Sequence, residues 1–112
     1  MLLTPHHIIL TSESEKIQLN TLQNKKALHI LRAINHPLRL EIIKLIDERK
    51  RMTVKEIYSH FKIEQAVASQ HLAVLRRAGF VGTKKESKFV YYTLSYNFIS
   101  RFTTTIQMLF AE

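Results

Sequence analysis

The sequence predicts a mainly α-helical domain with a small β-hairpin, which is an α+β fold. Three observations support this prediction: apolar residues recur at helical spacing along most of the chain, the 112 residues include only two Gly and two Pro, and β-branched and aromatic residues take over from residue 81. Apolar residues make up 46% of the chain, which suits a compact core and argues against disorder. We expect a single domain over residues 1–112, because the chain is too short for a second core.

The N-terminal third is expected to be mostly one helix. Residues 8–10 are apolar and fit either a short strand or packing on a neighbour. Residues 12–15 have the spacing of a capping box, and apolar residues follow at mostly helical intervals, which predicts a helix over 13–35. A polar interruption at 24–26 leaves open a division into two shorter helices. Pro37 suits the first turn of the next helix, where a missing N–H removes no hydrogen bond.

Residues 53–79 predict two short helices joined by a tight turn, a helix-turn-helix. Thr53 and Glu56 form a second capping box, and the apolar residues behind them follow the i, i+3, i+4, i+7 pattern. Residues 62–64 are short enough to be the turn between the two helices. Gly79 is placed to end the second helix in a left-handed conformation.

Residues 81–94 predict an antiparallel hairpin with a polar tip at 86–87, because β-branched and aromatic residues dominate both arms. Ser95 is expected to cap a last helix over 96–111, whose apolar residues lie on one face. A helix-turn-helix followed directly by such a hairpin predicts a winged helix-turn-helix fold.

Charge favours a polyanionic partner. The formal net charge is +8 and the pI is about 10.0, although charge alone does not separate DNA, RNA and anionic lipid. The absence of cysteine excludes disulfides, thiolate metal sites and thiol redox switches. No apolar run approaches the roughly 20 residues that span a bilayer, and the first residues lack the pattern of a secretory signal. We therefore expect a cytoplasmic protein that does not act at a membrane.

The second helix of the pair, residues 65–78, is predicted to present a smooth polar face opposite its buried side. The buried side consists of Ala68, Leu72 and Leu75. The opposite side carries small or polar residues, namely Ala66, Gln70, Ala73 and Arg77, flanked by Gln65, Ser69 and Arg76. Such a face can enter the roughly 12 Å major groove, where Gln70 can pair with adenine and Ser69 can bond a base edge or a phosphate. The alternative is an ordinary solvent-facing helix.

The neighbouring cationic residues have more than one possible role. His71 borders the buried side of its helix, so a packed histidine and a base reader are equally compatible with its position. Arg76, near the helix end, suits a phosphate or the helix dipole. The hairpin lysines suit sequence-independent phosphate contact, or they protect an exposed strand edge from aggregation. The residues expected to contact DNA are Thr53, Gln65, Ser69, Gln70, His71, Arg76, Lys84, Lys85 and Lys88.

Taken together, these segments resemble the ArsR/SmtB-type winged helix-turn-helix transcriptional regulators. The resemblance covers roughly residues 28–95 and rests on segments 33–42 and 65–81, on the basic tip 84–88, and on the strand 90–94 that leaves the tip. It implies a homodimer, built mainly from the first and last helices, that binds a palindromic operator as a repressor. It also implies that Ser69, Gln70 and His71 lie at the major groove.

The sequence departs from the family pattern in three ways. Glu64 stands where a Ser or Thr cap is usual, and Ser87 replaces the common glycine at the tip, so we expect a less sharply turned hairpin. The metal-sensing members use cysteines or pairs of Asp and His on the last helix, and residues 96–111 contain none of these. We therefore expect neither a metal site nor another cofactor.

The last helix carries more apolar residues than a small monomer is expected to cover. The predicted dimer interface consists of Ile17, Leu22, Ile99, Phe102, Ile106 and Leu109. The alternative is that the last helix folds onto its own subunit. Two other functions remain open: a winged-helix interaction scaffold without specific DNA binding, and RNA binding in which the hairpin aromatics stack on bases. No grouping of residues suggests an enzyme.

Overall fold

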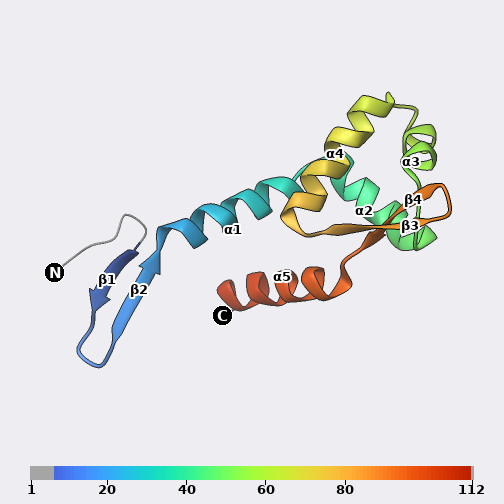
Figure 1. Cartoon of the computed structure of the whole chain (residues 1–112). Coiled ribbons are helices and arrows are strands. Elements are labelled where there is room, and N and C mark those ends of the chain that lie inside the picture. Colours follow the sequence, from blue (N-terminus) through green and yellow to red (C-terminus); the bar gives the residue numbers. More distant parts are fainter. Residues whose placement is uncertain (1–6, 112) are drawn as a thin grey trace. The chain divides into compact units, whose positions relative to one another are not determined.

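The computed structural model describes residues 7–111 and divides into two compact units, residues 1–32 and 33–112, which we describe separately (Figure 1). The elements follow in the order β1 (His7–Thr11), β2 (Lys16–Asn20), α1 (Thr21–Ile34), α2 (Pro37–Arg49), α3 (Val54–Phe61), α4 (Gln65–Ala78), β3 (Val81–Glu86), β4 (Phe89–Leu94) and α5 (Tyr96–Leu109). This is the expected α+β class, with a second hairpin that the sequence did not clearly predict.

The prediction of a helix over residues 13–35 is wrong in its first part. Residues 16–20 form β2, which pairs antiparallel with β1, and α1 begins only at Thr21. Ser12 explains the difference, because its hydroxyl accepts a hydrogen bond from the Glu15 N–H at 3.1 Å and donates to the Glu15 carbonyl at 3.0 Å. These bonds close a hairpin turn with the same residue spacing as a capping box. The strand alternative for residues 8–10 is confirmed, and α1 continues without a break through 24–26.

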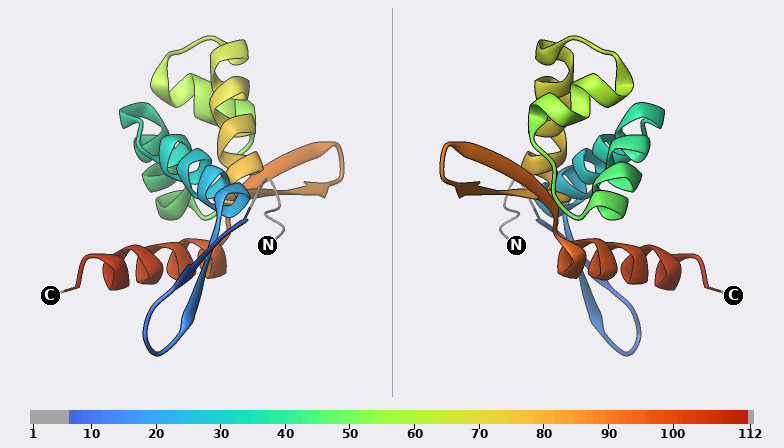
Figure 2. Two further views of the ribbon diagram at one scale, coloured as in Figure 1. Left: turned by 90° about the vertical axis from the view of Figure 1, so that its left-hand side faces the viewer. Right: turned by 90° about the vertical axis from the view of Figure 1, so that its right-hand side faces the viewer.

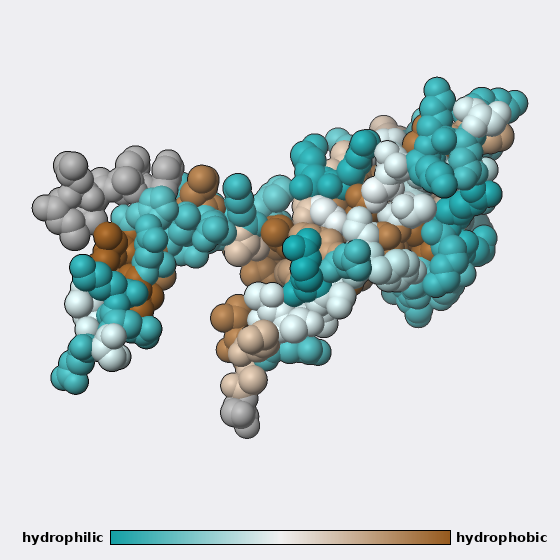
Figure 3. Space-filling view, turned by 60° about the horizontal axis from the view of Figure 1, so that its bottom comes forward, coloured by the Kyte–Doolittle hydropathy of each residue, from teal (hydrophilic) through white to brown (hydrophobic). Residues whose placement is uncertain are grey.

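The first hairpin has one apolar face. Ile8 pairs with Leu19 and Leu10 pairs with Ile17, so all four side chains lie on the same face of the two strands. Each of them is substantially exposed, and Figure 3 shows apolar residues on the surface of this hairpin. Ile17 therefore lies on a strand and not on a helix, although it remains apolar and exposed.

Unit 2 begins with α2, which starts at Pro37 as expected. The residue before it, His36, is the N-cap, and its Nδ1 accepts a hydrogen bond from the Leu38 N–H at 3.2 Å. Sequence reasoning did not assign this cap, because histidine is not among the usual capping residues.

The helix-turn-helix consists of α3 and α4. The predicted capping box at Thr53 and Glu56 is confirmed in both of its hydrogen bonds. Lys62 ends α3 in a left-handed conformation with φ of 54°, and Ile63 N–H donates to the Tyr58 carbonyl at 3.1 Å. Glu64 is the N-cap of α4 but makes no capping hydrogen bond through its side chain.

Gly79 ends α4 as predicted. Its φ is 107°, and its N–H donates to the carbonyls of Leu75 and Arg76 at 3.1 Å each. A Cβ at this position would lie 3.1 Å from the ring of Phe98, so both the backbone conformation and the packing favour glycine.

The hairpin of β3 and β4 is the wing of this fold, and Figure 2 shows it projecting away from the helices of unit 2. Glu86 pairs with Phe89, which leaves a tip of two residues, and Ser87 adopts a φ of 56° there. The expectation of a less sharply turned tip is wrong, because the turn keeps its tight form and the serine takes the left-handed conformation. Met52 adds a short bridge to the wing through hydrogen bonds with Tyr92 of 3.1 and 2.7 Å.

The core of unit 2 joins α2, α3, α4 and the start of the wing. Its buried side chains include Ile42, Leu45, Ile46, Met52, Ile57, Ala68, Leu72, Leu75, Phe80 and Val81. Phe98 and Phe102 of α5 lie edge-on to Phe80, with ring centroids 5.1 and 5.4 Å away. These contacts attach one side of α5 to its own subunit.

The rest of α5 is uncovered. Ser95 is its N-cap, as expected, but its side chain makes no capping hydrogen bond, so this part of the prediction is wrong. No residue of α5 is fully buried, and near its end Met108, Leu109 and Phe110 are 71–79% exposed. Within residues 7–111, none of the helices has the length and apolar character that spanning a bilayer requires.

Candidate nucleic-acid interface

The outward face of α4 is exposed and carries small or polar side chains but no large apolar one. Ala68, Leu72 and Leu75 are completely buried beneath it, which fixes the orientation of the helix in the unit. Its exposed side carries Gln65, Ala66, Ser69, Gln70, Arg76 and Arg77, with Ala73 half-buried among them. The division between buried and exposed sides follows the predicted one.

Two open hollows flank this face. The first, about 420 Å³, is lined by Arg39 of α2 and by Gln70, His71, Ala73, Val74 and Arg77 of α4. The second, about 470 Å³, is lined by Ser69, Ala73, Arg76 and Arg77 of α4 and by Tyr92 of the wing. Ala73 and Arg77 border both hollows, so the centre of the face is a small residue beside a guanidinium group. The lining of both hollows includes arginine and no acid, which favours an anionic partner.

His71 is both packed and partly exposed. Its Nδ1 accepts a hydrogen bond from the Arg39 Nε–H at 3.2 Å, and its ring lies 4.9 Å from the ring of His36. Burial lowers the pKa of His71, and the nearby charges of Arg39 and His36 lower it further. The ring is therefore neutral near pH 7.

The wing lysines differ in their surroundings. Neighbouring residues of a strand point to opposite faces, so Lys84 shares a face with Glu86 while Lys85 shares the other face with Tyr92. Lys84 Nζ lies 3.6 Å from a Glu86 carboxylate oxygen. Lys85 is exposed and makes no ion pair with any residue of the described range 7–111. Tyr92 borders the hollow beside α4. Lys85 therefore lies on the face of the wing that borders this hollow, and Lys84 lies on the other face.

Arg51 supports the opposite face of the wing. Its guanidinium pairs with the Glu86 carboxylate and lies over the ring of Tyr91 at 4.3 Å. The two cations lower the pKa of the Glu86 carboxyl, Arg51 more strongly than Lys84. The acid in the wing tip is thus neutralised by the protein itself.

Thr53 lies at the start of α3 with its hydroxyl already engaged. The hydroxyl accepts from the Glu56 N–H at 3.2 Å and donates to the Glu56 carboxylate at 3.0 Å. Lys88 is exposed at the wing tip, and its Nζ lies 5.5 Å from the Phe89 ring centroid. Of the residues expected to contact DNA, Ser69, Gln70, His71 and Arg76 thus line the two hollows beside α4, whereas Gln65 and the wing lysines do not and Thr53 serves as a cap.

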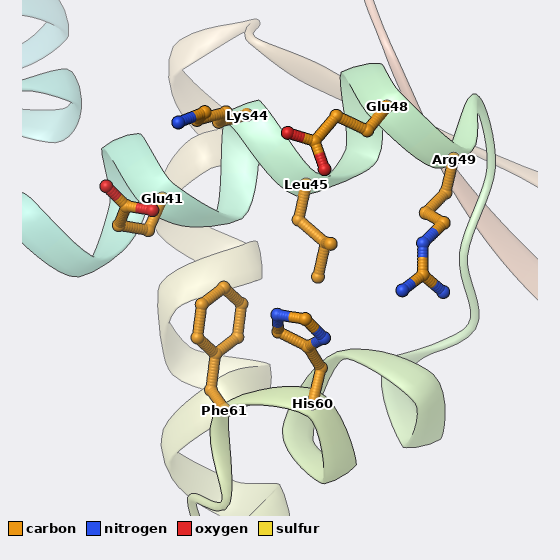
Figure 4. A pocket seen from close by; sticks show the side chains of 7 residues that line it. All are labelled: Glu41, Lys44, Leu45, Glu48, Arg49, His60 and Phe61. Atoms are coloured by element: carbon orange, nitrogen blue, oxygen red, sulfur yellow. The ribbon is translucent and has the colours of Figure 1, made fainter.

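A third hollow, between α2 and α3, has a different character (Figure 4). It has a volume of about 240 Å³ and is lined by charges of both signs, with Glu41, Lys44, Glu48 and Arg49 from α2 facing His60 and Phe61 of α3 across Leu45. A polyanion is not favoured by such a mixed surface. No group of three His, Asp or Glu side chains placed to hold a metal ion occurs within residues 7–111.

Sequence reasoning missed Arg39 and Arg51. Both lie outside the helix-turn-helix, Arg39 on α2 and Arg51 in the loop that follows α2. No spacing rule connects a residue of α2 to a hollow beside α4. The charge of Arg39 was visible in the sequence, but its proximity to His71 depends on how the two helices pack.

Known proteins are similar to this chain in sequence and in fold. The family profile described as "Bacterial regulatory protein, arsR family" matches residues 36–83. The transcriptional activator HlyU of Vibrio cholerae serotype O1 is 34% identical over 87 residues, covering 78% of this chain and 80% of that protein. The biofilm growth-associated repressor of Agrobacterium fabrum is 31% identical over 81 residues, covering 72% and 68%. The solved structure of reduced HlyU from Vibrio cholerae N16961 superposes with a TM-score of 0.60 at 34% identity, covering 81% of this chain and 95% of that chain.

The fold and these relatives define a DNA-binding transcription regulator with a winged helix-turn-helix. The chain belongs to the arsR family of bacterial regulatory proteins, as the resemblance in its sequence indicated. The family and the relatives named above are transcription regulators and not enzymes.

Proposed function

We propose that this regulator reads a palindromic operator as a homodimer and represses transcription from it. The observation that carries the proposal is the exposed, small-residue face of α4, which lies between two hollows lined by arginine and beside the wing. An α-helix without bulky outward side chains can lie deep in the major groove.

The residues of this surface divide into two roles. Gln70, Ser69 and His71 read base edges, with Gln65 at the helix start close to the same groove. Cationic residues at the helix end and on the wing bind phosphates: Arg76, Lys85 and Lys88 directly, and Lys84 more weakly, because it lies on the opposite face of the wing. Phosphate contacts supply affinity and position the helix, while base contacts supply specificity. Thr53 contributes by capping α3, because its hydroxyl is already used.

The exposed apolar residues support a homodimer. Phe102 is attached to the core of its own subunit, whereas Leu109 and its neighbours at the end of α5 have no cover within unit 2. In unit 1, Ile17 and Leu22 are likewise exposed. We assign Ile17, Leu22, Ile99, Phe102, Ile106 and Leu109 to the interface. A dimer would place two copies of α4 about 34–36 Å apart, one turn of duplex DNA.

The remaining parts of the proposal follow from this function. The regulator works in the cytoplasm, where its operator is, and it needs neither a membrane partner nor a cofactor. It is not an enzyme, in keeping with a family and relatives that are transcription regulators.

Selection of bound duplexes from a random pool tests this proposal. An enriched inverted repeat with half-sites about one helical turn apart is the expected result. A pool that shows no enrichment, together with unchanged partner binding after neutralisation of Lys84, Lys85 and Lys88, would favour an interaction scaffold. Stronger competition by single-stranded RNA than by duplex DNA would favour RNA binding. Reporter transcription in a strain lacking the gene separates repression from activation, because loss of a repressor raises expression.

A further inference from the structure

We propose that Arg39 fixes the imidazole of His71 in the tautomer whose Nε2 carries the proton, so that His71 offers DNA a hydrogen-bond donor. The inference rests on the proposed function and adds to it a positioning residue on a different helix. It also assigns the chemistry of the group that His71 contacts, which is a hydrogen-bond acceptor on a base edge or on a phosphate.

The geometry at Nδ1 carries the first step. The Arg39 Nε–H lies 3.2 Å from His71 Nδ1. A guanidinium group has only donors, so Nδ1 accepts this bond and carries no proton. A neutral imidazole then has its proton on Nε2.

Arg39 is itself held in place. Its Nη1 donates to the carbonyl of Ala33 at 3.2 Å, while its Nε donates to His71. The two bonds use different edges of one planar group, which limits the rotation of the side chain. His36, whose ring lies 4.9 Å from that of His71, has its Nδ1 engaged by the Leu38 N–H. The partners of His71 are therefore set by the start of α2.

The protonation state agrees with this assignment. Burial and the neighbouring groups Arg39 and His36 lower the pKa of His71, so the ring is neutral near pH 7. A doubly protonated ring would have a donor at Nδ1 and would have to break the bond from Arg39.

The ring also borders the proposed DNA surface. His71 lines the same hollow as Gln70 and Arg77, both of which are exposed on α4. It is half-buried, so one edge of the ring is packed while the residue still reaches the hollow.

A donor at this place discriminates among bases. In the major groove, guanine, adenine and thymine each present an acceptor, whereas cytosine presents its amino donor. A base contact from Nε2–H therefore disfavours cytosine at one position of each half-site. A phosphate contact would add affinity without such a preference.

Two variants of Arg39 isolate the effect. In Arg39→Gln, the amide nitrogen occupies the place of Nε along the side chain, so a donor to Nδ1 is kept while the charge is removed. In Arg39→Met, the length is similar but the donor is lost. His71→Leu identifies the ring signals by their disappearance and, because leucine has no donor, removes the proposed contact.

The first measurement is nitrogen-15 NMR of the histidine rings in the full-length protein at pH 7.5, without DNA. We expect His71 to show a protonated Nε2 and an unprotonated Nδ1 in the wild type and in Arg39→Gln, and a mixture of tautomers in Arg39→Met. A wild-type ring protonated at Nδ1 would overturn the inference. This readout does not depend on whether the protein binds DNA.

The second measurement is binding of the wild type and variants to duplexes selected by the wild type and to their single-base variants. Arg39→Gln and Arg39→Met both remove the charge that borders the hollow. We expect Arg39→Met to bind roughly fivefold more weakly per half-site than Arg39→Gln, and His71→Leu to bind roughly fivefold more weakly per half-site than the wild type, which is the size of one ordinary hydrogen bond. A loss confined to one position identifies a base, and a uniform loss identifies a phosphate. If Arg39→Gln behaves like Arg39→Met, the tautomer is not the cause and the inference fails. If no duplex is selected at all, the proposed function fails as well, whereas a wrong tautomer with a selected operator overturns the inference alone.

Discussion

Replacement of Lys85 by alanine is expected to weaken DNA binding without changing the preferred sequence. Lys85 is exposed on the same face of the wing as Tyr92, which lines the hollow next to α4. Lys84 lies on the other face, 3.6 Å from the Glu86 carboxylate. Lys84 and Lys85 thus provide a matched pair. Their side chains lie on opposite faces of the wing, and within residues 7–111 only Lys84 has a carboxylate 3.6 Å away.

The magnitude follows from counterion release. Each lost phosphate contact lowers the slope of log K against log salt by about 0.9, so a dimer that loses Lys85 twice should lose about 1.8. If the variant and the wild type bind equally well at 1 M salt, this change in slope lowers the affinity of the variant at 0.15 M salt. The affinity falls roughly fivefold per half-site and roughly thirtyfold per operator. Lys84→Ala should change the slope by less than half as much, because Lys84 lies on the opposite face of the wing, away from the hollow beside α4.

Fluorescence anisotropy with operator and scrambled duplexes, between 0.05 and 0.3 M potassium chloride, measures both quantities. We expect Lys85→Ala to reduce affinity for the two duplexes by the same factor. A larger change in slope for Lys84→Ala than for Lys85→Ala would refute the orientation argument. A loss seen only with the operator would show that Lys85 reads a base.

Four further predictions concern specificity and stability. Gln70→Ala should cost about 1–3 kcal/mol on the operator and relax preference at one position of each half-site, as competition with single-base variants will show. Ser87→Gly should stabilise the protein by about 1 kcal/mol and raise its Tm by about 4–8 °C, because glycine removes the strain of a left-handed residue at the wing tip. Gly79→Ala should destabilise it by about 2–4 kcal/mol in urea unfolding, since the left-handed conformation and the contact with Phe98 add their costs, and an unchanged midpoint would contradict this. The pKa of His71 is lowered in the folded protein, so the unfolded chain binds the proton more readily. The contribution of His71 to the free energy of unfolding is therefore fully present above the unfolded pKa of about 6.5 and is lost as the pH falls through the folded pKa. Urea unfolding between pH 7.5 and 5.0 should therefore show a steeper fall for the wild type than for His71→Gln.

The sequence predicted correctly those helix ends that are determined by a few neighbouring residues. The capping box at Thr53, the first helical turn at Pro37 and the left-handed end at Gly79 all appear in the structure. Each of these depends on a few neighbouring residues, so the surrounding packing has little opportunity to override it.

The failures came where one local pattern fits two structures. The spacing of Ser12 and Glu15 suits a helix start and also a hairpin turn, and the strand partner of residues 16–20 decided between them. At the wing tip, Ser87 was expected to widen the turn, but the paired strands hold the two-residue connection and impose the unusual conformation. Long-range pairing is not visible in a window of a few residues.

At the candidate site too, features set by neighbouring residues could be predicted and features set by long-range packing could not. The exposed face of α4 followed from helical periodicity, whereas the difference between Lys84 and Lys85 required the strand register. The two possible roles of His71, packed histidine or base reader, remained open because the position of Arg39 depends on how α2 packs against α4. Residues far apart in sequence meet at this site only through the core beneath it.

The most direct test of the proposed DNA surface is a titration of nitrogen-15-labelled protein with its selected duplex, followed by amide resonances. The largest perturbations should fall on the α4 residues 65–77 and on the wing residues 83–92. The amides that border the hollow of mixed charge between α2 and α3 should stay near their free positions. Perturbations centred on that hollow, with those of α4 and the wing unmoved, would contradict the assignment of the reading surface.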